Sequence, residues 1–429
     1  MNFLLILIGK LVLFTSRTFN LGSGSTWPGH VAMEINSSFV RQILKKNPKL
    51  RVVLVAGTNG KTTTCFMLHK ILEEGGLKVF RNEAGANLMN GIASTIIKNS
   101  DLTGKLNFDV AIFEVDEKNV SLALKEIKPY AILMLNIFRD QLDRYGEINE
   151  VAKDWQNALV DIKDTTLLFT NGDDPQLSHL TQNSKHKTYF FGVNEKFMGK
   201  KETPHDVDFI YCPKCQTKLE YQKMSYSHMG KFNCPSCGFT NPKTETFPTL
   251  PHPLFGNYNI YNSNAAALVA TKAFGISKGE VQKALKNFKP AFGRQEIIKY
   301  KNRNLFVLLS KNPAGFNQSI DTIRSLNMKG NILLVLNDRI PDGRDVSWIW
   351  DVDFENLPKN SKVFVSGDRA YDMALRIKYS QKPALVFENL DSAIEQAIKE
   401  SVQNETLFIL PTYSAMLEAR KILTGKKIL

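Results

Sequence analysis

The residues of this chain best suited to chemistry form one glycine-rich segment, which directly follows an apolar run at residues 52–56. A glycine-rich turn between a buried strand and a helix lets backbone N–H groups approach phosphate oxygens, and the positive end of the helix dipole favours the anion. Lys61 adds a cation for the β- and γ-phosphates, and the Thr62 hydroxyl is placed to bind Mg²⁺. The segment predicts a site for a nucleoside triphosphate, whose ligands are Gly57, Thr58, Asn59, Gly60, Lys61, Thr62 and Thr63.

Two further expectations concern this loop. Val55 stands where the usual phosphate-binding loop has a glycine, so the loop is a shortened variant. We expect the loop to be exposed, with Lys61 supplying charge rather than packing. A Lys61→Ala protein is therefore expected to lose nucleotide turnover and to fold normally.

Two polar residues come at the ends of predicted buried strands further along the chain. Glu114 ends an apolar strand, and a carboxylate at the carboxyl end of a parallel strand lies beside the phosphate loop as a Mg²⁺ ligand. The alternative is an acidic residue that merely starts a loop. Asn136 follows another such strand and can orient a phosphate or a water molecule there, although a helix cap explains it nearly as well.

Asn259 and Asn262 lie one helical turn apart, just before an alanine run. Two amides on one helix face suit close packing beside a purine base, and helix capping is the competing interpretation. We place both residues, together with Arg294, among the nucleotide-binding residues.

Four of the five cysteines have the spacing of a metal site. Cys212 and Cys215 form one CxxC pair, and Cys234 and Cys237 form a second pair after eighteen intervening residues. Two such pairs can close a tetrahedral Cys₄ zinc site, and no open coordination position is suggested, so the zinc should be structural. Disulfide pairing is the alternative, and a reducing cytosol disfavours it. Cys65 is expected to be a packed helical side chain.

Length and charge limit the class of protein. The 429 residues suffice for two or three domains, and the formal charge of +13 suits anionic partners or, equally, a plain basic surface. The apolar N-terminal run is interrupted by Lys10 and lacks the features of a cleaved signal peptide. It predicts a packed or amphipathic first helix in a cytoplasmic protein, with contact to a membrane surface as the open alternative.

Strands and helices alternate along most of the chain, which predicts an α/β protein with parallel sheets covered by helices on both faces. The expected strands of the first domain are 52–56, 78–81, 110–115, 131–135, 166–170 and 188–191. Those of the second are 306–309, 332–336, 362–365, 384–387 and 406–410. We divide the chain into an N-terminal helical segment (1–45), a central domain (46–295) with a zinc-ribbon insert (about 201–246), and a smaller Rossmann-like C-terminal domain (296–429).

Together these motifs resemble the Mur ligase family of ATP-dependent amide-forming enzymes. The matching segments are 57–64, Glu114, Asn136 with 140–144, 171–175, Gly256 with Asn259 and Asn262, and Asn312-Pro313. The chain departs from the family pattern at Gln141 and Lys311, where the family has histidines. Because the predicted phosphate-binding strand begins by residue 52, we expect the family's UDP-binding domain to be missing.

Within this family the chain is most similar to the ligase-like subunits of two-chain amidotransferases. The similarity lies in the Cys₄ insert and in two segments, 311–315 and 342–348. It implies that ATP activates the α-carboxylate of D-glutamate in lipid II as an acyl phosphate. Ammonia from a GatD-type glutaminase partner then gives D-isoglutamine at the inner membrane face, with ATP, Mg²⁺ and structural Zn²⁺ as cofactors. It also implies that Asp345 completes the partner's Cys-His pair, although a loop carboxylate paired with Arg344 is equally compatible with the residues alone.

Release of ammonia from glutamine needs a cysteine nucleophile with a histidine. Four cysteines of this chain are assigned to zinc and Cys65 follows the phosphate loop in a helix, so we expect the ammonia to come from solution or from another chain. Lys61, Glu114 and Asp345 are the predicted catalytic residues, and Thr62 and Glu114 the predicted Mg²⁺ ligands. Two other functions stay open. One is a Mur- or folylpolyglutamate-type ligase that adds an amino acid. The other is a zinc-ribbon NTPase acting on nucleic acid, which would show steep salt dependence; we expect no nucleic-acid partner.

Overall fold

The computed structural model of the chain describes residues 2–18, 26–83, 85–140, 148–199, 205–290, 293–402 and 404–425. Its centre is a six-stranded sheet in the order β2-β3-β1-β4-β5-β6, in which all neighbouring strands run parallel. The strands are β1 (Arg51–Ala56), β2 (Val79–Arg81), β3 (Val110–Val115), β4 (Ala131–Met134), β5 (Leu167–Asn171) and β6 (Thr188–Phe191). They match the expected positions to within one residue at each end, and the α/β fold class is confirmed.

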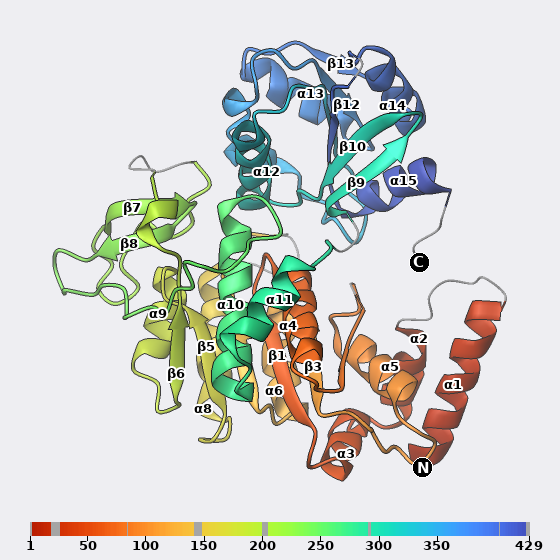
Figure 1. Cartoon of the computed structure of the whole chain (residues 1–429), viewed down its shortest axis with the longest axis vertical. Helices are drawn as coiled ribbons and strands as arrows, with labels where there is room; N and C mark the ends of the chain where they lie inside the picture. The colour runs from red at the N-terminus through yellow and green to blue at the C-terminus, as the bar shows by residue number, and fades with distance from the viewer. Residues whose placement is uncertain are drawn as a thin grey trace.

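Helices cover both faces of this sheet (Figure 1). Alternate side chains of β1 show why: Val53 and Val55 pack into one buried cluster, whereas Leu54 and Ala56 pack into the other. The first face carries α4 (Lys61–Glu74), α10 (Asn257–Phe274) and α11 (Lys278–Lys286). The second face carries α5 (Met89–Asn99), α6 (Val120–Glu126), α8 (Ile148–Val160) and α9 (Pro175–Gln182).

Three N-terminal helices pack beside α5 and extend the second face. They are α1 (Asn2–Thr18), α2 (Trp27–Ile35) and α3 (Phe39–Lys46). Gly29 of α2 lets the two backbones approach closely, because a Cβ there would lie 1.9 Å from the carbonyl oxygen of Asn90 in α5. The N-terminal helical segment is therefore anchored to the central sheet.

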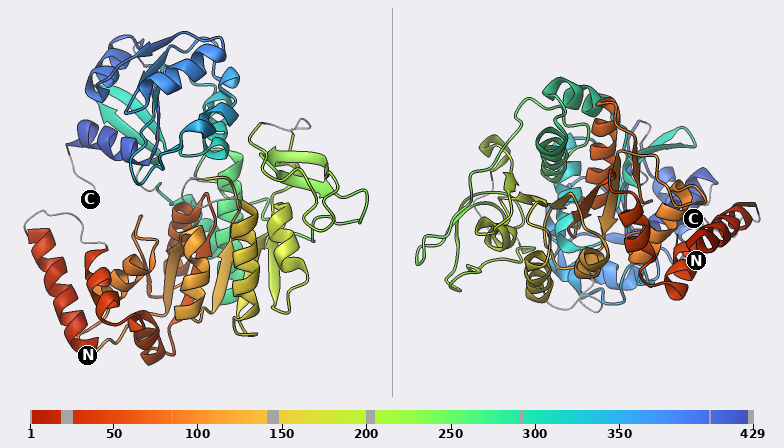
Figure 2. Two further views of the ribbon diagram at one scale, coloured as in Figure 1. Left: turned by 180° about the vertical axis from the view of Figure 1, so that it is seen from behind. Right: turned by 90° about the horizontal axis from the view of Figure 1, so that it is seen from below.

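A two-stranded antiparallel ribbon, β7 (Glu220–Tyr226) and β8 (Met229–Asn233), follows β6 and stands at the edge of the sheet (Figure 2). Asp173, just beyond β5, holds it in place by accepting a salt bridge from Lys231 of β8 at 3.0 Å. Its other oxygen accepts a hydrogen bond of 3.0 Å from Tyr261 of α10. The next residue, Asp174, caps α9. The 171–175 motif thus joins β5, the ribbon and α10.

A second six-stranded sheet, in the order β13-β12-β11-β14-β10-β9, forms the C-terminal part. Its strands are β9 (Arg294–Tyr300), β10 (Arg303–Leu308), β11 (Ile332–Val335), β12 (Val363–Ser366), β13 (Ala384–Val386) and β14 (Leu407–Pro411). Its helices are α12 (Pro313–Leu326), α13 (Ala370–Tyr379), α14 (Leu390–Lys399) and α15 (Tyr413–Thr424). β9 is antiparallel to β10 and was not expected from the sequence. The domain boundaries at 46, 201–246 and 296 remain our proposed division.

Candidate nucleotide and amidation site

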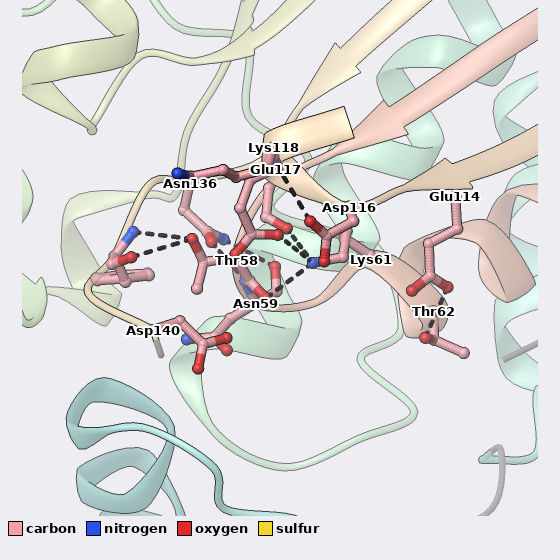
Figure 3. Close-up of polar contacts among 12 residues, drawn as sticks. Thr58, Asn59, Lys61, Thr62, Glu114, Asp116, Glu117, Lys118, Asn136 and Asp140 are labelled. Carbon is pink, nitrogen blue, oxygen red and sulfur yellow. Dashed lines mark hydrogen bonds and ion pairs between the residues drawn. The ribbon is translucent and has the colours of Figure 1, made fainter. Parts of the chain in front are cut away.

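The glycine-rich loop lies between β1 and α4, at the carboxyl edge of the central sheet, as the sequence predicts (Figure 3). Gly60 caps α4 with φ of 87°, a conformation that side chains rarely adopt. A Cβ on Gly60 would also lie 2.2 Å from Oδ1 of Asn262. Gly57 has φ of 144° and packs against Leu135 and Asn136. Both glycines are therefore required by backbone conformation and by close approach.

Lys61 is buried, which corrects the expectation of an exposed loop. Its ammonium donates hydrogen bonds to the carbonyl oxygens of Gly57 and Thr58 and forms a 3.0 Å ion pair with Glu117, which is also buried. Burial alone would lower the pKa of Lys61, but Glu117, Glu114 and Asp116 together hold it above the ordinary value. Lys61 is thus a protonated cation at the loop, and it stabilises a buried carboxylate as well.

Thr62, Glu114 and Arg294 form a chain of hydrogen bonds beside the loop. Arg294 donates to the Thr62 hydroxyl at 3.0 Å, and this hydroxyl donates to Oε2 of Glu114 at 2.7 Å. Thr62 and Glu114 therefore offer adjacent oxygens at the sheet edge, the ligand type that Mg²⁺ prefers. Nearby, Oε1 of Glu117 is buried and has no hydrogen-bond partner among the described residues. This oxygen-rich surrounding fits the metal that the sequence predicts.

Asn136 contacts the backbone of the loop. Its side chain accepts a hydrogen bond of 2.8 Å from the N–H of Asn59 and donates one of 3.0 Å to the Asn59 carbonyl. Thr58 is held in a similar way, because its hydroxyl accepts the N–H of Phe138 at 3.0 Å. Both contacts come from the segment after β4. Asn136 therefore fixes the conformation of the loop backbone.

A cavity of about 70 Å³ adjoins the loop. Six of the predicted nucleotide-binding residues line it: Asn59, Gly60, Thr63, Asn259, Asn262 and Arg294. Asn262 donates to Asn259 at 3.0 Å, so the two amides hold each other beside Gly60. Five further polar residues line the same cavity and were not predicted from the sequence: Tyr226, Tyr258, Gln295, Gln318 and Ser319. Tyr226 belongs to the ribbon, so no local pattern placed it here.

The C-terminal part reaches the loop through Lys311 and Asn312. Asn312 exchanges amide hydrogen bonds with Asn59 at 3.1 and 3.2 Å. Lys311 forms an ion pair with the buried carboxylate of Asp140. Burial and the neighbouring Glu117 raise the pKa of Asp140 against the opposing effect of Lys311. Residues 141–144 of the same motif lie outside the described residues.

A second cavity, of about 100 Å³, begins at this ion pair. It is lined by Arg139, Asp140, Lys311, Asn312, Pro313, Asp345, Ser347, Trp348 and Asp351. Arg139 closes one side, because it pairs with Asp208 and, at 3.0 Å, with Asp351. Asp345 is half-buried and accepts the N–H of Ser347 at 2.8 Å. Asp345 therefore lines the same cavity as Asn312, which contacts the loop residue Asn59. This cavity shares no lining residue with the cavity beside the loop.

The four spaced cysteines come together beyond the start of β7 and the end of β8, at the end of the ribbon opposite its turn. Their sulfur atoms all lie within 4.8 Å of one another, and none forms a disulfide. Tetrahedral zinc with Zn–S distances of about 2.3 Å places sulfur atoms roughly 3.8 Å apart. The pairs Cys212–Cys237 at 3.7 Å and Cys215–Cys234 at 3.4 Å are close to that spacing. The cluster fits a structural zinc ion, and Cys65 is buried in α4 as expected.

Comparison with known protein families gives two matches. The Mur ligase middle domain matches residues 55–270, and the MurT ligase C-terminal domain matches residues 309–416. Among curated proteins, the lipid II isoglutaminyl synthase (glutamine-hydrolyzing) subunit MurT of Streptococcus pneumoniae is 32% identical, covering 95% of this chain and 94% of that protein. The subunit of the same name from Staphylococcus aureus is 30% identical, with 83% of each chain covered.

Solved structures show the same fold. A pseudomurein peptide ligase type C from Methanothermus fervidus superposes with a TM-score of 0.68 at 22% identity, covering 90% of this chain and 81% of that one. The MurF ligase from Thermotoga maritima, solved with ADP, has a TM-score of 0.62 at 16% identity and covers 90% of this chain and 82% of its own.

Proposed function

This chain belongs to the Mur ligase family, in its MurT branch, and we propose that it is the ATP-dependent ligase subunit of a lipid II isoglutaminyl synthase. In this reaction the α-carboxylate of D-glutamate in the lipid II stem peptide becomes the amide of D-isoglutamine. The nitrogen comes from glutamine, which a GatD-type glutaminase partner hydrolyses. The chain would thus act in peptidoglycan synthesis.

The observation that carries the proposal is the cavity between Asp345 and the Asp140–Lys311 pair. A nitrogen source at Asp345 would have a short path to the edge of the nucleotide loop. The chain's own cysteines do not suit glutamine hydrolysis. Four of them lie together in an arrangement that could hold a metal ion, and burial raises the pKa of the Cys65 thiol, which disfavours the thiolate nucleophile. Ammonia must therefore reach this site from solution or from a second chain.

The proposed reaction has two steps, and each is a nucleophilic substitution. A carboxylate oxygen of the substrate attacks the γ-phosphorus of ATP, and ADP leaves, which gives an acyl phosphate. The nitrogen of ammonia then attacks the acyl carbon, the C–O bond to phosphate breaks, and the nitrogen loses a proton to leave the neutral amide. Lys61 and the N–H groups of residues 60–62, at the N-terminus of α4, would bind the phosphates and stabilise the charge that moves toward the leaving ADP.

Two metals accompany this proposal. Thr62 and Glu114 would hold Mg²⁺, which neutralises phosphate charge when bound. The four cysteines would hold a structural zinc ion that stabilises the ribbon and, with it, Tyr226 beside the nucleotide. Asp345 would orient the catalytic histidine of the glutaminase partner, as the carboxylate of a Ser-His-Asp triad does. The protein would work in the cytoplasm and meet its lipid-linked substrate at the membrane.

The test incubates the purified chain with ATP and lipid II and measures both ATP hydrolysis and amide formation. The nitrogen source is ammonium alone, glutamine alone, or glutamine plus the glutaminase partner. We expect amide formation with ammonium, none with glutamine alone, and restored turnover with glutamine plus partner. Incorporation of an amino acid in place of ammonia would contradict the proposal and favour a conventional Mur-type ligase. ATP hydrolysis stimulated by nucleic acid and not by lipid II would contradict it as well.

A further inference from the structure

Helix α1 buries one side and exposes a continuous apolar stripe on the other. Leu5, Ile6 and Leu13 pack into the core beside α5. Gly9 allows this contact, since a Cβ there would lie 2.9 Å from the Ile97 side chain. Six large apolar residues on the same helix are exposed at 42–67%: Phe3, Leu4, Leu7, Ile8, Leu11 and Phe14. Their spacing of three and four residues puts them side by side along the helix.

This stripe differs from scattered surface hydrophobics, because α1 has no acidic residue and carries its six exposed apolar side chains within twelve consecutive positions. Lys10 lies at its margin and is partly buried, as expected of a side chain whose stem covers apolar surface. Trp27, at the start of α2, adds an aromatic ring that is 67% exposed. Aromatic rings of this kind are favoured at membrane–water interfaces.

The surroundings of α1 are basic. The first 50 residues contain six lysines and arginines against one acidic residue, Glu34. Asn2 at the start of α1 donates a hydrogen bond of 2.8 Å to Gln42 of α3, so the two helices meet there. Lys45 and Lys46 at the end of α3 and Lys49 just beyond it are all exposed. An apolar stripe with cations on the neighbouring helix is complementary to a bilayer that contains anionic lipids.

The position of α1 also suits this role. It lies at the outer margin of the molecule in the views of Figures 1 and 2, away from the ribbon and from the C-terminal sheet. Leu13 near its end lines a cavity of about 280 Å³ together with Arg81, the last residue of β2. Arg81 pairs with Ile112 of β3, so it lies level with Val53 in the middle of β1. Leu13 belongs to the buried side of α1, so the exposed stripe faces away from this cavity.

We propose that α1 is an interfacial anchor that inserts its exposed stripe (residues 3, 4, 7, 8, 11 and 14) into the surface of an anionic membrane. The helix would lie in the plane of the interface, because within the described ranges no helix is both long and apolar enough to cross a bilayer. The inference rests on the proposed function in one respect: the anchor would bring the enzyme to a substrate that is linked to lipid. The binding itself needs no substrate.

The test is co-sedimentation of the full chain with vesicles that contain neither lipid II nor a protein partner. Phosphatidylglycerol–phosphatidylcholine vesicles are compared with phosphatidylcholine vesicles. The variants are Leu7→Glu/Leu11→Glu and the uncharged Leu7→Gln/Leu11→Gln. A matched control, Val160→Glu/Val402→Glu, adds the same charge at two valines that are 65% and 64% exposed and lie elsewhere in the chain.

We expect the wild type to partition onto the anionic vesicles more strongly than onto the neutral ones. Both leucine variants should weaken this partitioning by about tenfold or more, and the control variant should bind as the wild type does. Absence of wild-type binding to either vesicle would overturn the inference, and so would equal loss in the control. A self-association that the leucine variants abolish, without vesicle binding by the wild type, would instead make the stripe an interface between two copies.

Amidation of lipid II in detergent micelles separates this inference from the proposed function. The leucine variants should retain wild-type amidation there, because α1 contributes no residue to either cavity at the loop. If wild-type protein with its partner fails to amidate in micelles, the proposed function is wrong, while the vesicle result stands by itself.

Discussion

The Thr62 hydroxyl donates a hydrogen bond of 2.7 Å to Oε2 of Glu114, linking the first turn of α4 to the end of β3. Arg294, from the strand that begins the C-terminal sheet, donates to the same hydroxyl at 3.0 Å. The predicted metal ligands of the central sheet are thereby tied to the C-terminal part. Nucleotide binding and the arrangement of the two sheets should depend on each other through Thr62.

Glu114→Gln should raise the Mg²⁺ concentration required for half-maximal ATP turnover by about tenfold or more, because the amide lacks the negative charge that attracts the cation. Thr62→Val should act in the same direction, and Thr62→Ser, which keeps the hydroxyl, should stay close to wild type. The measurement is a Mg²⁺ titration of ATPase activity. An unchanged titration for Glu114→Gln would remove this residue from the metal site.

Lys61→Ala should abolish turnover and also destabilise the protein, since it leaves the buried Glu117 carboxylate without its partner. Breaking a buried ion pair from one side costs about 3–5 kcal/mol. Chemical denaturation should therefore show a clearly lower free energy of unfolding for Lys61→Ala than for the wild type. The double variant Lys61→Ala/Glu117→Gln should regain part of this free energy. Equal free energies of unfolding for the wild type and Lys61→Ala would contradict a stabilising role of the Lys61–Glu117 pair.

Cys212→Ser and Cys237→Ser should each remove one bound zinc ion per chain and lower the melting temperature, because metal binding and folding of the ribbon are coupled. Cys65→Ala is the matched control: it removes a thiol outside the cluster and should keep the metal. Elemental analysis with thermal melts checks both points. A wild type without zinc, or cluster variants of normal stability, would contradict the structural role.

His205 and Asp353 form an ion pair of 2.5 Å between the ribbon segment and the C-terminal part. The hydrogen bond to Asp353 raises the pKa of His205 above its ordinary value. A raised folded-state pKa adds stability below the unfolded pKa, near 6.5, and this stability is lost as the pH rises through the folded value. The melting temperatures of wild type and His205→Gln should therefore differ below pH 6 and converge in the alkaline range. The difference should be small, since His205 is mostly exposed.

The phosphate loop, the parallel strands and the cysteine cluster could be predicted from the sequence, because each depends on local residue types and their spacing. Strand β9 could not be predicted, because its charged, half-exposed residues resemble a linker in the sequence. Only pairing with β10 in the folded protein makes this segment a strand. Glu117 and Tyr226 were missed for a related reason. Their roles arise from contacts with Lys61 and with the nucleotide cavity, which only the tertiary fold creates.

The most direct test of the two-chain amidotransferase is Asp345→Asn in complex with the glutaminase partner, assayed with both nitrogen sources. The exposed Asp391→Asn on α14 makes the same chemical change away from the cavity. We predict that Asp345→Asn loses glutamine hydrolysis and glutamine-dependent amidation, by up to ~10⁴-fold if Asp345 orients a histidine as a triad carboxylate does. Amidation from high ammonium should persist in both variants, because Lys61, Thr62 and Glu114 are unchanged. Equal failure with both nitrogen sources in a folded complex, or no effect on either, would contradict the account.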